Sequence, residues 1–327
     1  MNDIGFMLKY VWPVMRKAYK NDIPKRCARC IISEKCDDTL EYSNFCKACS
    51  VYDQEVKVKK HNLPADRYRK FMDVMLKIES DPRRILFLLS GGKDSIYCLK
   101  HLRETFHSHH IIAMVVDCGF INEIALGNAR WAAKEYGVDL IHVRSHQGQF
   151  KKKLREAFLN LGSEGCYKQI DFVHGSTIFD VGKLFCRDLG IEVMASGMSP
   201  EQLELIVCDN SCVMEQDEWP GLKQVFPMAV WNPSEEQINK HIPDHIETDP
   251  LKTNHSLVLP MCVLDIKRLG YFSFEQEFGS LVRRGKADRK KWLYAFEMLE
   301  FFSRKGWLDP IANNELAKLG LSLKDLT

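Results

Sequence analysis

One short stretch constrains this chain more than any other. It follows the apolar run 85–89 and precedes a helix-like segment that begins at residue 96, and its members are Ser90, Gly91, Gly92, Lys93, Asp94 and Ser95. This order predicts a strand, a tight loop and a helix. The two glycines let backbone N–H groups approach an anion, while the hydroxyls and Lys93 add donors and a positive charge. A flexible turn is the alternative, but the flanking strand and helix patterns favour a phosphate site.

The hexapeptide also points to a family. The chain contains no Gly-x-x-x-x-Gly-Lys-Ser/Thr pattern, so the loop is not of the Walker type. It resembles the SGGxDS signature of the PP-loop, or N-type, ATP pyrophosphatases, a group that includes GMP synthetase, asparagine synthetase, tRNA thiolation enzymes and sugar amidotransferases. The resemblance covers residues 84–205. It implies that ATP, with Mg²⁺, is cleaved between its α- and β-phosphates, and that the adenylate activates a carbonyl oxygen for replacement by nitrogen or sulfur.

Short apolar runs alternate with helix-like segments along the middle of the chain. This alternation predicts an α/β fold with a doubly wound parallel sheet whose ligands bind at the carboxyl ends of the strands. We expect strands at 85–89, 111–116, 139–143 and 191–195, and helices at 66–79, 125–136 and 172–189. The expected domains are an N-terminal helix with a four-cysteine, zinc-ribbon-like module (1–60), a PP-loop domain (61–215) and a mostly helical C-terminal region (216–327).

Composition narrows the class of protein. The 327 residues are 45% hydrophobic and 28% charged, as in ordinary water-soluble domains, and the net charge of +2 disfavours bulk binding of a long polyanion. No run approaches the roughly 18 apolar residues that span a bilayer. The apolar segment 6–15 is interrupted by Lys9 and Pro13, so we interpret it as a docking helix and expect a cytoplasmic protein without membrane partners.

Twelve cysteines occur in a chain that shows no secretion signal, which indicates metal or thiol chemistry in a reducing compartment. Two C-x-x-C pairs are separated by residues 31–45 and predict a structural zinc site, because four thiolates leave no open coordination position. The proposed ligands are Cys27, Cys30, Cys46 and Cys49. The alternatives are four ordinary cysteines or a redox-active pair, and Cys36 is either a spare thiol or an alternate ligand.

The end of the second expected strand lies next to the loop in a sheet of this type. The resemblance places Val116 and Asp117 beside adenine, and Asp94 and Asp117 near magnesium. Cys118 is then close to the nucleotide, where a thiolate would carry a persulfide and attack the adenylated carbon. The alternative is a small buried hydrophobic residue that ends a strand. The catalytic candidates are therefore Lys93, Asp94, Cys118 and, from the next segment, Cys166.

Three further features depend mainly on the resemblance. Cys166 falls where tRNA thiolation relatives carry a C-x-x-C pair, although only one cysteine is present here. Cys166, Cys208 and Cys212 would together hold an iron–sulfur cluster, and unrelated buried or loop cysteines are the favoured alternative. The turn after the fourth expected strand contains Gly197, a nucleotide-site candidate, and Glu201, a weaker magnesium candidate.

The C-terminal region contains a basic run between Arg283 and Lys291. A solvated helix face is the favoured interpretation, and a site for a substrate phosphate or a partner is the alternative.

These features support three hypotheses. The first is an ATP-dependent sulfurtransferase that acts on a nucleotide or nucleobase carbonyl, such as that of a guanine nucleotide, with sulfur from a cysteine desulfurase. The second is a sugar amidotransferase that receives ammonia from a separate glutaminase, since sugar amidotransferases also place paired C-x-x-C motifs before this loop and Asn128 falls where those relatives have Asn. The third is a zinc-containing nucleotide-sensing or RNA-binding module. Both enzyme hypotheses expect a small-molecule or nucleotide substrate, and a homodimer stays an open option.

Overall fold

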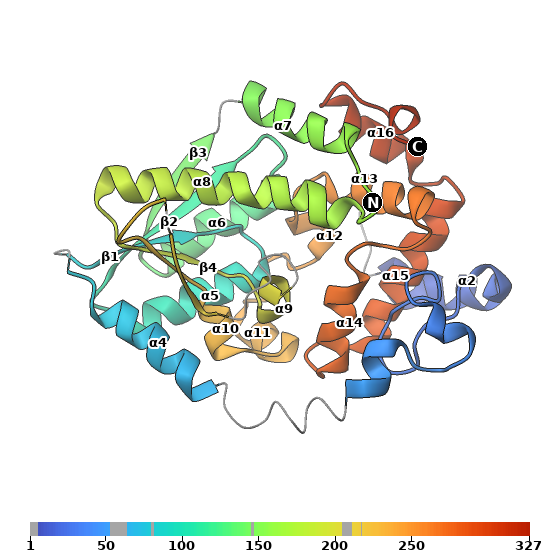
Figure 1. Ribbon diagram of the computed structural model, residues 1–327, viewed down its shortest axis with the longest axis horizontal. Coiled ribbons are helices and arrows are strands. Elements are labelled where there is room, and N and C mark those ends of the chain that lie inside the picture. The colour runs from blue at the N-terminus through green and yellow to red at the C-terminus, as the bar shows by residue number, and fades with distance from the viewer. Residues whose placement is uncertain (1–5, 53–63, 80–81, 145–146, 205–210, 217) are drawn as a thin grey trace. The chain divides into compact units, whose positions relative to one another are not determined.

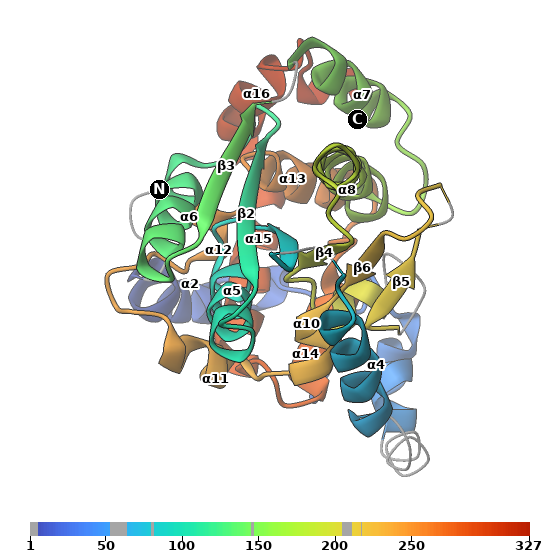
Figure 2. The same cartoon turned by 90° about the vertical axis from the view of Figure 1, so that its left-hand side faces the viewer.

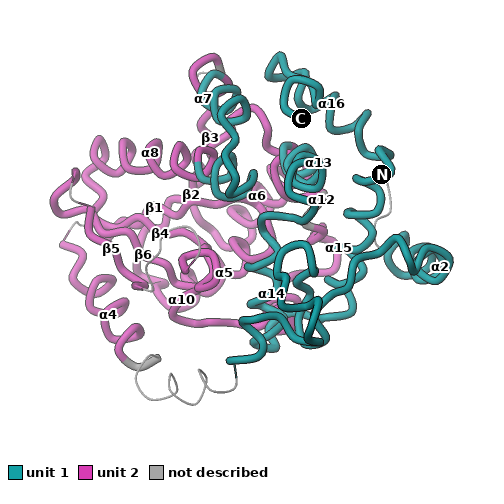
Figure 3. Tube along the Cα trace, turned by 45° about the vertical axis from the view of Figure 1, so that its right-hand side comes forward, with its two compact units in different colours: residues 1–60, 152–172, 257–327 teal, residues 61–151, 173–256 magenta. Residues whose placement is uncertain are grey.

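The computed structural model describes residues 6–52, 64–79, 82–144, 147–204, 211–216 and 218–327 (Figure 1). It divides into two compact units (Figure 3). Unit 1 comprises residues 1–60, 152–172 and 257–327, and unit 2 comprises residues 61–151 and 173–256. The units are defined by contacts, whereas the three domains expected above were defined by motifs, so those boundaries (1–60, 61–215, 216–327) stay a prediction.

Unit 2 is built on one sheet, in which six strands of the described residues lie in the order β3-β2-β1-β4-β6-β5. Neighbouring strands are parallel except for β5 and β6, which are antiparallel. The doubly wound sheet expected from the sequence is thereby confirmed. The strands are β1 (Arg84–Leu88), β2 (His110–Asp117), β3 (Asp139–Arg144), β4 (Val193–Ser196), β5 (Val213–Glu215) and β6 (Lys223–Val225).

The register brings three strand ends to one edge of the sheet. Leu88, the last residue of β1, lies opposite Met114 of β2 and Ser196 of β4. β2 and β4 flank β1 on opposite sides. Strands β2 and β3 follow on one side of β1, and the chain then crosses to place β4 on its other side. In open sheets of this kind, ligands bind in the crevice at that crossing point, outside the carboxyl ends of the strands.

β1 is apolar and buried on both faces, which explains the two helical layers. Ile85 and Phe87 are fully buried in the core that also contains Phe71 of α4 (Pro64–Leu76) and Leu99 of α5 (Lys93–Thr105). On the other face, a Cβ at Gly182 of α8 (Phe172–Leu189) would lie 2.6 Å from the Met194 sulfur. This glycine therefore lets α8 lie close against the sheet, opposite α6 (Glu123–Glu135), as Figure 2 shows.

The remaining helices in the middle of the chain are short, except for α7. They are α7 (Gln147–Leu159), α9 (Pro200–Gln202), α10 (Pro227–Trp231), α11 (Glu235–His241) and α12 (Pro250–Thr253).

Unit 1 is helical around a small cysteine-containing segment. Its helix α13 (Val258–Arg268) packs against α15 (Arg289–Arg304) and α16 (Asp309–Ala317). Trp12 of α2 (Trp12–Ala18) is fully buried, and its indole N–H donates to Glu297 of α15 over 3.4 Å. The N-terminal helix therefore docks on α15. The other elements are η1 (Met7–Val11), η2 (Lys20–Asp22), η3 (Asp38–Glu41), η4 (Tyr167–Asp171), α14 (Glu275–Arg283) and η6 (Leu323–Asp325).

Candidate functional site

The loop between β1 and α5 has a backbone shape that requires glycine. Gly91 has φ +77°, in the region that side chains with a Cβ rarely adopt. A Cβ added there would lie 1.9 Å from the carbonyl oxygen of Ala125 in α6. The loop backbone therefore lies directly against the first turns of α6, and no larger residue fits at this position.

Side chains of the loop hold it in this shape through a ring of hydrogen bonds. Ser90 Oγ donates to Ser95 Oγ over 2.9 Å, and Ser95 Oγ donates to the Gly92 carbonyl over 2.9 Å. The Gly92 N–H donates back to Ser90 Oγ over 3.3 Å. Asn128 of α6 adds a hydrogen bond from Nδ2 to the Gly91 carbonyl (3.1 Å). These bonds, together with the one from α6, fix the shape of the loop.

The first turn of α5 is left without a side-chain cap. Its N-cap is Gly92, which provides no side-chain hydrogen bond. Side chains of Asn122, Ser234 and Asp288 cap α6, α11 and α15, whereas α10, α13, α14 and α16 also lack a side-chain cap. The start of α5 is therefore distinguished by the glycine-containing loop before it, together with the missing cap. Backbone N–H groups at the start of a helix have no partner within the helix and carry a partial positive charge. The motif therefore presents donors suited to phosphate oxygens.

The turn after β4 forms the other side of this site. A Cβ at Gly197 would lie 3.0 Å from the Cα of Ser95, so the turn lies against the first turn of α5. The preceding residue, Ser196, is buried, and its hydroxyl has no hydrogen-bond partner among the residues that the structure describes. Ser196 is not among the candidate residues predicted from the sequence, where its position directly before Gly197 is the only signal. Glu201, the weaker magnesium candidate, is buried in α9.

Lys93 and Asp94 form an ion pair at the loop. Lys93 Nζ lies 2.8 Å from Asp94 Oδ1, and the lysine side chain is 15% exposed whereas the aspartate side chain is 51% exposed. Burial lowers the pKa of Lys93, but the charges of Asp94 and Glu235 outweigh it, so the net pKa is raised and the ammonium group stays charged. Asp94 is the accessible carboxylate of the loop, which suits a magnesium ligand that keeps several waters.

Three candidate site residues, Val116, Asp117 and Cys118, lie at the carboxyl end of β2, at the same edge of the sheet as the loop. Asp117 is buried, accepts a hydrogen bond from the Gly119 N–H (2.7 Å) and pairs with Arg144 Nε at 3.1 Å. Its side chain thus closes an Asx turn with Gly119. Val116 and Cys118 are buried beside it, with exposures of 7% and 1%. Adenine contact by Val116 and Asp117 stays a prediction.

Cys166 has surroundings that keep its thiol neutral. It is buried in unit 1, and its backbone N–H donates to Asp265 Oδ1 over 2.8 Å. Burial, reinforced by the carboxylate of Asp265, raises the pKa of Cys166 well above the ordinary thiol value. A thiolate role for Cys166 therefore requires these surroundings to change.

The iron–sulfur hypothesis receives no support from the residues that the structure describes. Cys212 is buried in unit 2, where its Sγ lies 3.3 Å from the Arg67 carbonyl oxygen. The cysteine group able to hold a metal in the described ranges includes neither Cys166 nor Cys212. Cys208 lies outside the described residues.

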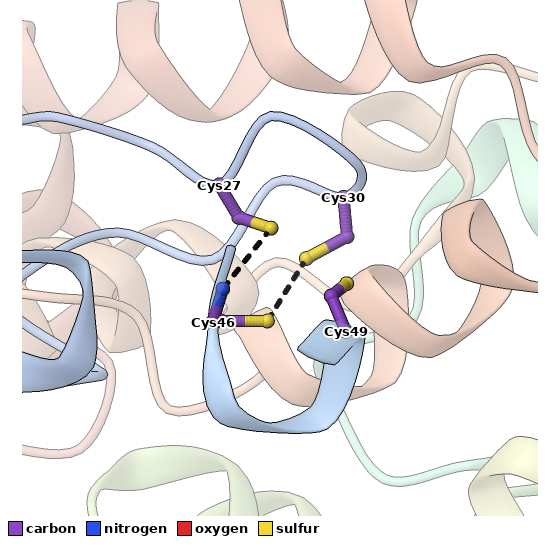
Figure 4. Close-up of side chains that lie close together, drawn as sticks. All are labelled: Cys27, Cys30, Cys46 and Cys49. Atoms are coloured by element: carbon purple, nitrogen blue, oxygen red, sulfur yellow. Dashed lines mark hydrogen bonds between the residues drawn. The ribbon is translucent and has the colours of Figure 1, made fainter. Parts of the chain in front are cut away.

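The two C-x-x-C pairs meet as the sequence predicts (Figure 4). Sulfur atoms of Cys27, Cys30, Cys46 and Cys49 all lie within 4.8 Å of one another, and the four residues are buried. Cys30 Sγ and Cys46 Sγ are 3.6 Å apart, and the Cys46 N–H donates to Cys27 Sγ over 3.4 Å. Four buried sulfurs at these separations fit one tetrahedral ion, for which Zn²⁺ is our proposal. We call these residues the four-cysteine group.

Cys36 does not belong to this group. Burial, together with the charge of Glu275, raises the pKa of Cys36 to about 12, so its thiol is neutral. The spare-thiol interpretation therefore fits Cys36 better than the role of an alternate ligand.

Comparisons with known proteins assign the chain to no family. No protein-family model matches it. The chain is 24% identical, over 276 residues, to the uncharacterized protein MJ1599 of Methanocaldococcus jannaschii; this alignment spans 81% of the chain and 91% of that protein. None of the described helices has the length and apolar character needed to cross a membrane.

Two solved structures resemble the chain weakly. The U34-tRNA thiolase NcsA from Methanococcus maripaludis, solved with its [4Fe-4S] cluster, is 15% identical with a TM-score of 0.38, over 84% of this chain and 89% of that chain. Phosphoadenylyl-sulfate reductase from Candida auris, in a phosphate complex, is 14% identical with a TM-score of 0.35, over 61% of this chain and 88% of that chain.

Proposed function

We propose that this protein is an ATP-dependent sulfurtransferase that adenylates a carbonyl oxygen of a nucleotide or nucleobase and replaces that oxygen with sulfur. The observation that carries the proposal is the hydrogen-bonded Ser90–Ser95 loop, which leaves the start of α5 without a side-chain cap at the carboxyl edge of the sheet. This arrangement suits a triphosphate held by backbone donors.

The reaction would have two displacements. In the first, the substrate carbonyl oxygen attacks the α-phosphorus of ATP, the bond to the β-phosphate oxygen breaks, and pyrophosphate leaves. In the second, sulfur attacks the activated carbon, the carbon–oxygen bond breaks, and AMP leaves with the former carbonyl oxygen. The chain contributes loop N–H donors and the Lys93 ammonium group, which offset negative charge that develops on the phosphates. Asp94 would hold Mg²⁺, which neutralises phosphate oxygens when bound.

The position of Cys118 makes it our candidate for sulfur transfer. It directly follows β2, whose carboxyl end lies at the same edge as the phosphate loop. Cys166 is a weaker candidate, because burial beside Asp265 raises its pKa. We propose that a cysteine desulfurase or a similar donor delivers sulfane sulfur to Cys118 as a persulfide, whose terminal sulfur attacks the activated carbon as AMP leaves. A thiol reductant from solution then cleaves the resulting S–S bond, which frees the thiolated product and returns Cys118 to the thiol while the reductant is oxidised to its disulfide.

The burial of both thiols also favours a second candidate function. Cys118 and Cys166 are each 1% exposed, which suits a nucleophile that arrives from solution. Ammonia from a separate glutaminase would meet this requirement, and the product would then be an amidine or amine at the activated carbon, as in the sugar amidotransferases that the sequence resembles.

Product analysis separates these functions. The full-length protein is incubated with ATP, Mg²⁺, a panel of nucleotides and amino sugars, and either sulfide or ammonium, and products are identified by mass spectrometry. Sulfur incorporation with AMP and pyrophosphate release supports the sulfurtransferase, and nitrogen incorporation supports the amidotransferase. Absence of AMP and pyrophosphate with every substrate would favour the nucleotide-sensing module.

Cysteine variants then test the carrier. Cys118→Ser should abolish turnover with a persulfide donor, whereas Cys186→Ser, which removes a buried thiol from α8, provides a matched control. If Cys118→Ser and Cys166→Ser both kept full activity, no role for either thiol would remain.

A further inference from the structure

The basic run between Arg283 and Lys291 contacts the four-cysteine group. Arg289, the first residue of α15, donates from Nε to the Cys30 carbonyl over 2.9 Å and from Nη2 to the Cys27 carbonyl over 2.7 Å. One guanidinium group therefore binds both residues of the first C-x-x-C pair through their backbone. A planar guanidinium makes two such bonds in a fixed geometry, which a lysine ammonium group does not reproduce.

Arg283, at the end of α14, reaches the second pair. Its Nη1 lies 3.6 Å from Cys49 Sγ, at hydrogen-bond distance for sulfur. The guanidinium also lies over the Tyr52 ring, 5.9 Å from its centroid, and Arg29 lies over the same ring at 5.7 Å. Arg283 is therefore held where it can donate directly to a ligand sulfur.

Close packing joins the same helices to the cysteine segment. A Cβ at Gly279 of α14 would lie 3.1 Å from the Ile32 side chain and 3.7 Å from Cys30 Sγ. Glu275, fully buried on the same helix, accepts hydrogen bonds from the Ser33 N–H (2.9 Å) and Ser33 Oγ (3.0 Å). The segment between the two C-x-x-C pairs is thus anchored to α14 by packing and by buried polar contacts.

Charge provides the reason for two arginines at this place. A divalent ion bound by four thiolates leaves a net negative charge in a buried group, and groups that donate to the ligands stabilise such centres. Arg289 satisfies two carbonyls of the first pair, and Arg283 donates to a sulfur of the second. These contacts with the four-cysteine group are made by Arg283 and Arg289.

We propose that Arg283 is an outer-shell positioning residue of the four-cysteine metal centre, and that Arg283 and Arg289 couple metal binding to the docking of residues 26–52 on α14 and α15. Arg283 and Arg289 of the basic run then serve the metal centre rather than a substrate phosphate or a partner. This inference concerns unit 1 and is independent of the function proposed above.

Metal affinity and metal spectroscopy test the role of Arg283. Zn²⁺ affinity is measured by competition with a chromophoric chelator, and thiolate-to-metal charge-transfer bands are recorded after Co²⁺ substitution. Arg283→Ala should weaken Zn²⁺ binding about 10- to 100-fold and shift the Co²⁺ bands. Arg283→Lys, which keeps a positive charge, should fall between this variant and the wild type. Lys290→Ala, which removes an exposed charge from the same run, should stay within about twofold of the wild type.

Two results would overturn the proposal. One is wild-type affinity and unchanged Co²⁺ bands in Arg283→Ala. The other is amide hydrogen exchange in α14 and α15 that is equally slow with and without metal. If Arg283→Ala does not fold, the rate at which a chelator extracts Zn²⁺ from folded Arg283→Lys gives the same test, with faster release expected and a wild-type rate contradicting the proposal.

Discussion

The Ser90–Ser95 loop of unit 2 and the four-cysteine group of unit 1 are both short segments held tightly by hydrogen bonds, yet they direct their polar groups differently. In the four-cysteine group, the sulfurs face one another, two carbonyls accept from Arg289, and Cys49 accepts from Arg283. In the loop, the serine side chains bond within the loop, while the helix start has no side-chain cap. The first arrangement is closed around its own sulfurs, which suits a structural metal ion. The second leaves donors for a ligand from solution.

The largest expected effect on turnover comes from a side chain at Gly91, where the loop has no room for one. Gly91→Ala places a Cβ 1.9 Å from the Ala125 carbonyl oxygen at φ +77°, so the loop must move by more than about 1 Å. A displacement of this size lowers turnover by about 100-fold or more. The measurement is the rate of pyrophosphate release, with circular dichroism to confirm that the protein is folded.

Gly127→Ala is the matched control. At Gly127 of α6 a Cβ would meet nothing within 4 Å, so the loop backbone stays as it is. Equal losses of activity in the two variants would contradict the role assigned to the shape of the loop.

Removal of the metal should act on stability. Cys46→Ser deletes one ligand of the four-cysteine group, and the loss of a structural metal belongs to the mechanisms that cost about 4 kcal/mol or more. For a unit of this size, such a cost lowers Tm by about 8–16 °C. Thermal unfolding and zinc content are measured together.

Cys36→Ser is the control for this variant, since Cys36 lies in the same segment outside the ligand group. A Tm and zinc content in Cys46→Ser equal to those of Cys36→Ser would show that the four-cysteine group holds no structural ion.

A smaller effect is expected when the loop keeps its shape but loses a support. Asn128 Nδ2 donates to the Gly91 carbonyl (3.1 Å) and to the Glu247 carbonyl (2.9 Å). Asn128→Ala leaves both carbonyls without this donor, and the lost bond to the Gly91 carbonyl contributes about 1 kcal/mol, so ATP binding should weaken by about 5-fold. Gly127→Ala, where a new Cβ meets nothing within 4 Å, should bind ATP like the wild type. Wild-type ATP affinity in Asn128→Ala would contradict the role of Asn128 in holding the loop.

The smallest effect is expected in the reactivity of the Cys166 thiol. Its raised pKa means that the thiol form persists as the pH rises past the ordinary value of 9.0, so alkylation by iodoacetamide should be slow in the folded protein at about pH 8.5 and fast in denaturant. The stabilisation from this neutral thiol is fully present below 9.0 and is lost as the pH rises through the folded pKa. Rapid labelling of Cys166 in the folded protein would restore it as a candidate nucleophile.

Local patterns predicted the elements that form the candidate site. The apolar run 85–89, followed by glycines and a helix, located β1, the loop and α5, because strand and helix periodicities differ and glycine marks the turn between them. The C-x-x-C spacing similarly predicted the four-cysteine group, since each pair brings two sulfurs together within one turn.

Contacts between distant segments were not predictable in the same way. The short strands β5 and β6 have only three residues each, too few for a periodic pattern. The hydrogen bonds of Asn128 and the contacts of Arg289 with Cys27 and Cys30 join residues far apart in the chain. A charged run such as 283–291 carries no local signal of what its side chains contact, so its arginines became interpretable only in the folded chain.

The products of ATP cleavage test the central claim most directly. The protein is incubated with ATP, Mg²⁺, the acceptor panel and sulfide or ammonium, and phosphorus NMR identifies the products. The account predicts AMP and pyrophosphate from the wild-type protein and neither from Gly91→Ala. Formation of ADP and orthophosphate would contradict it.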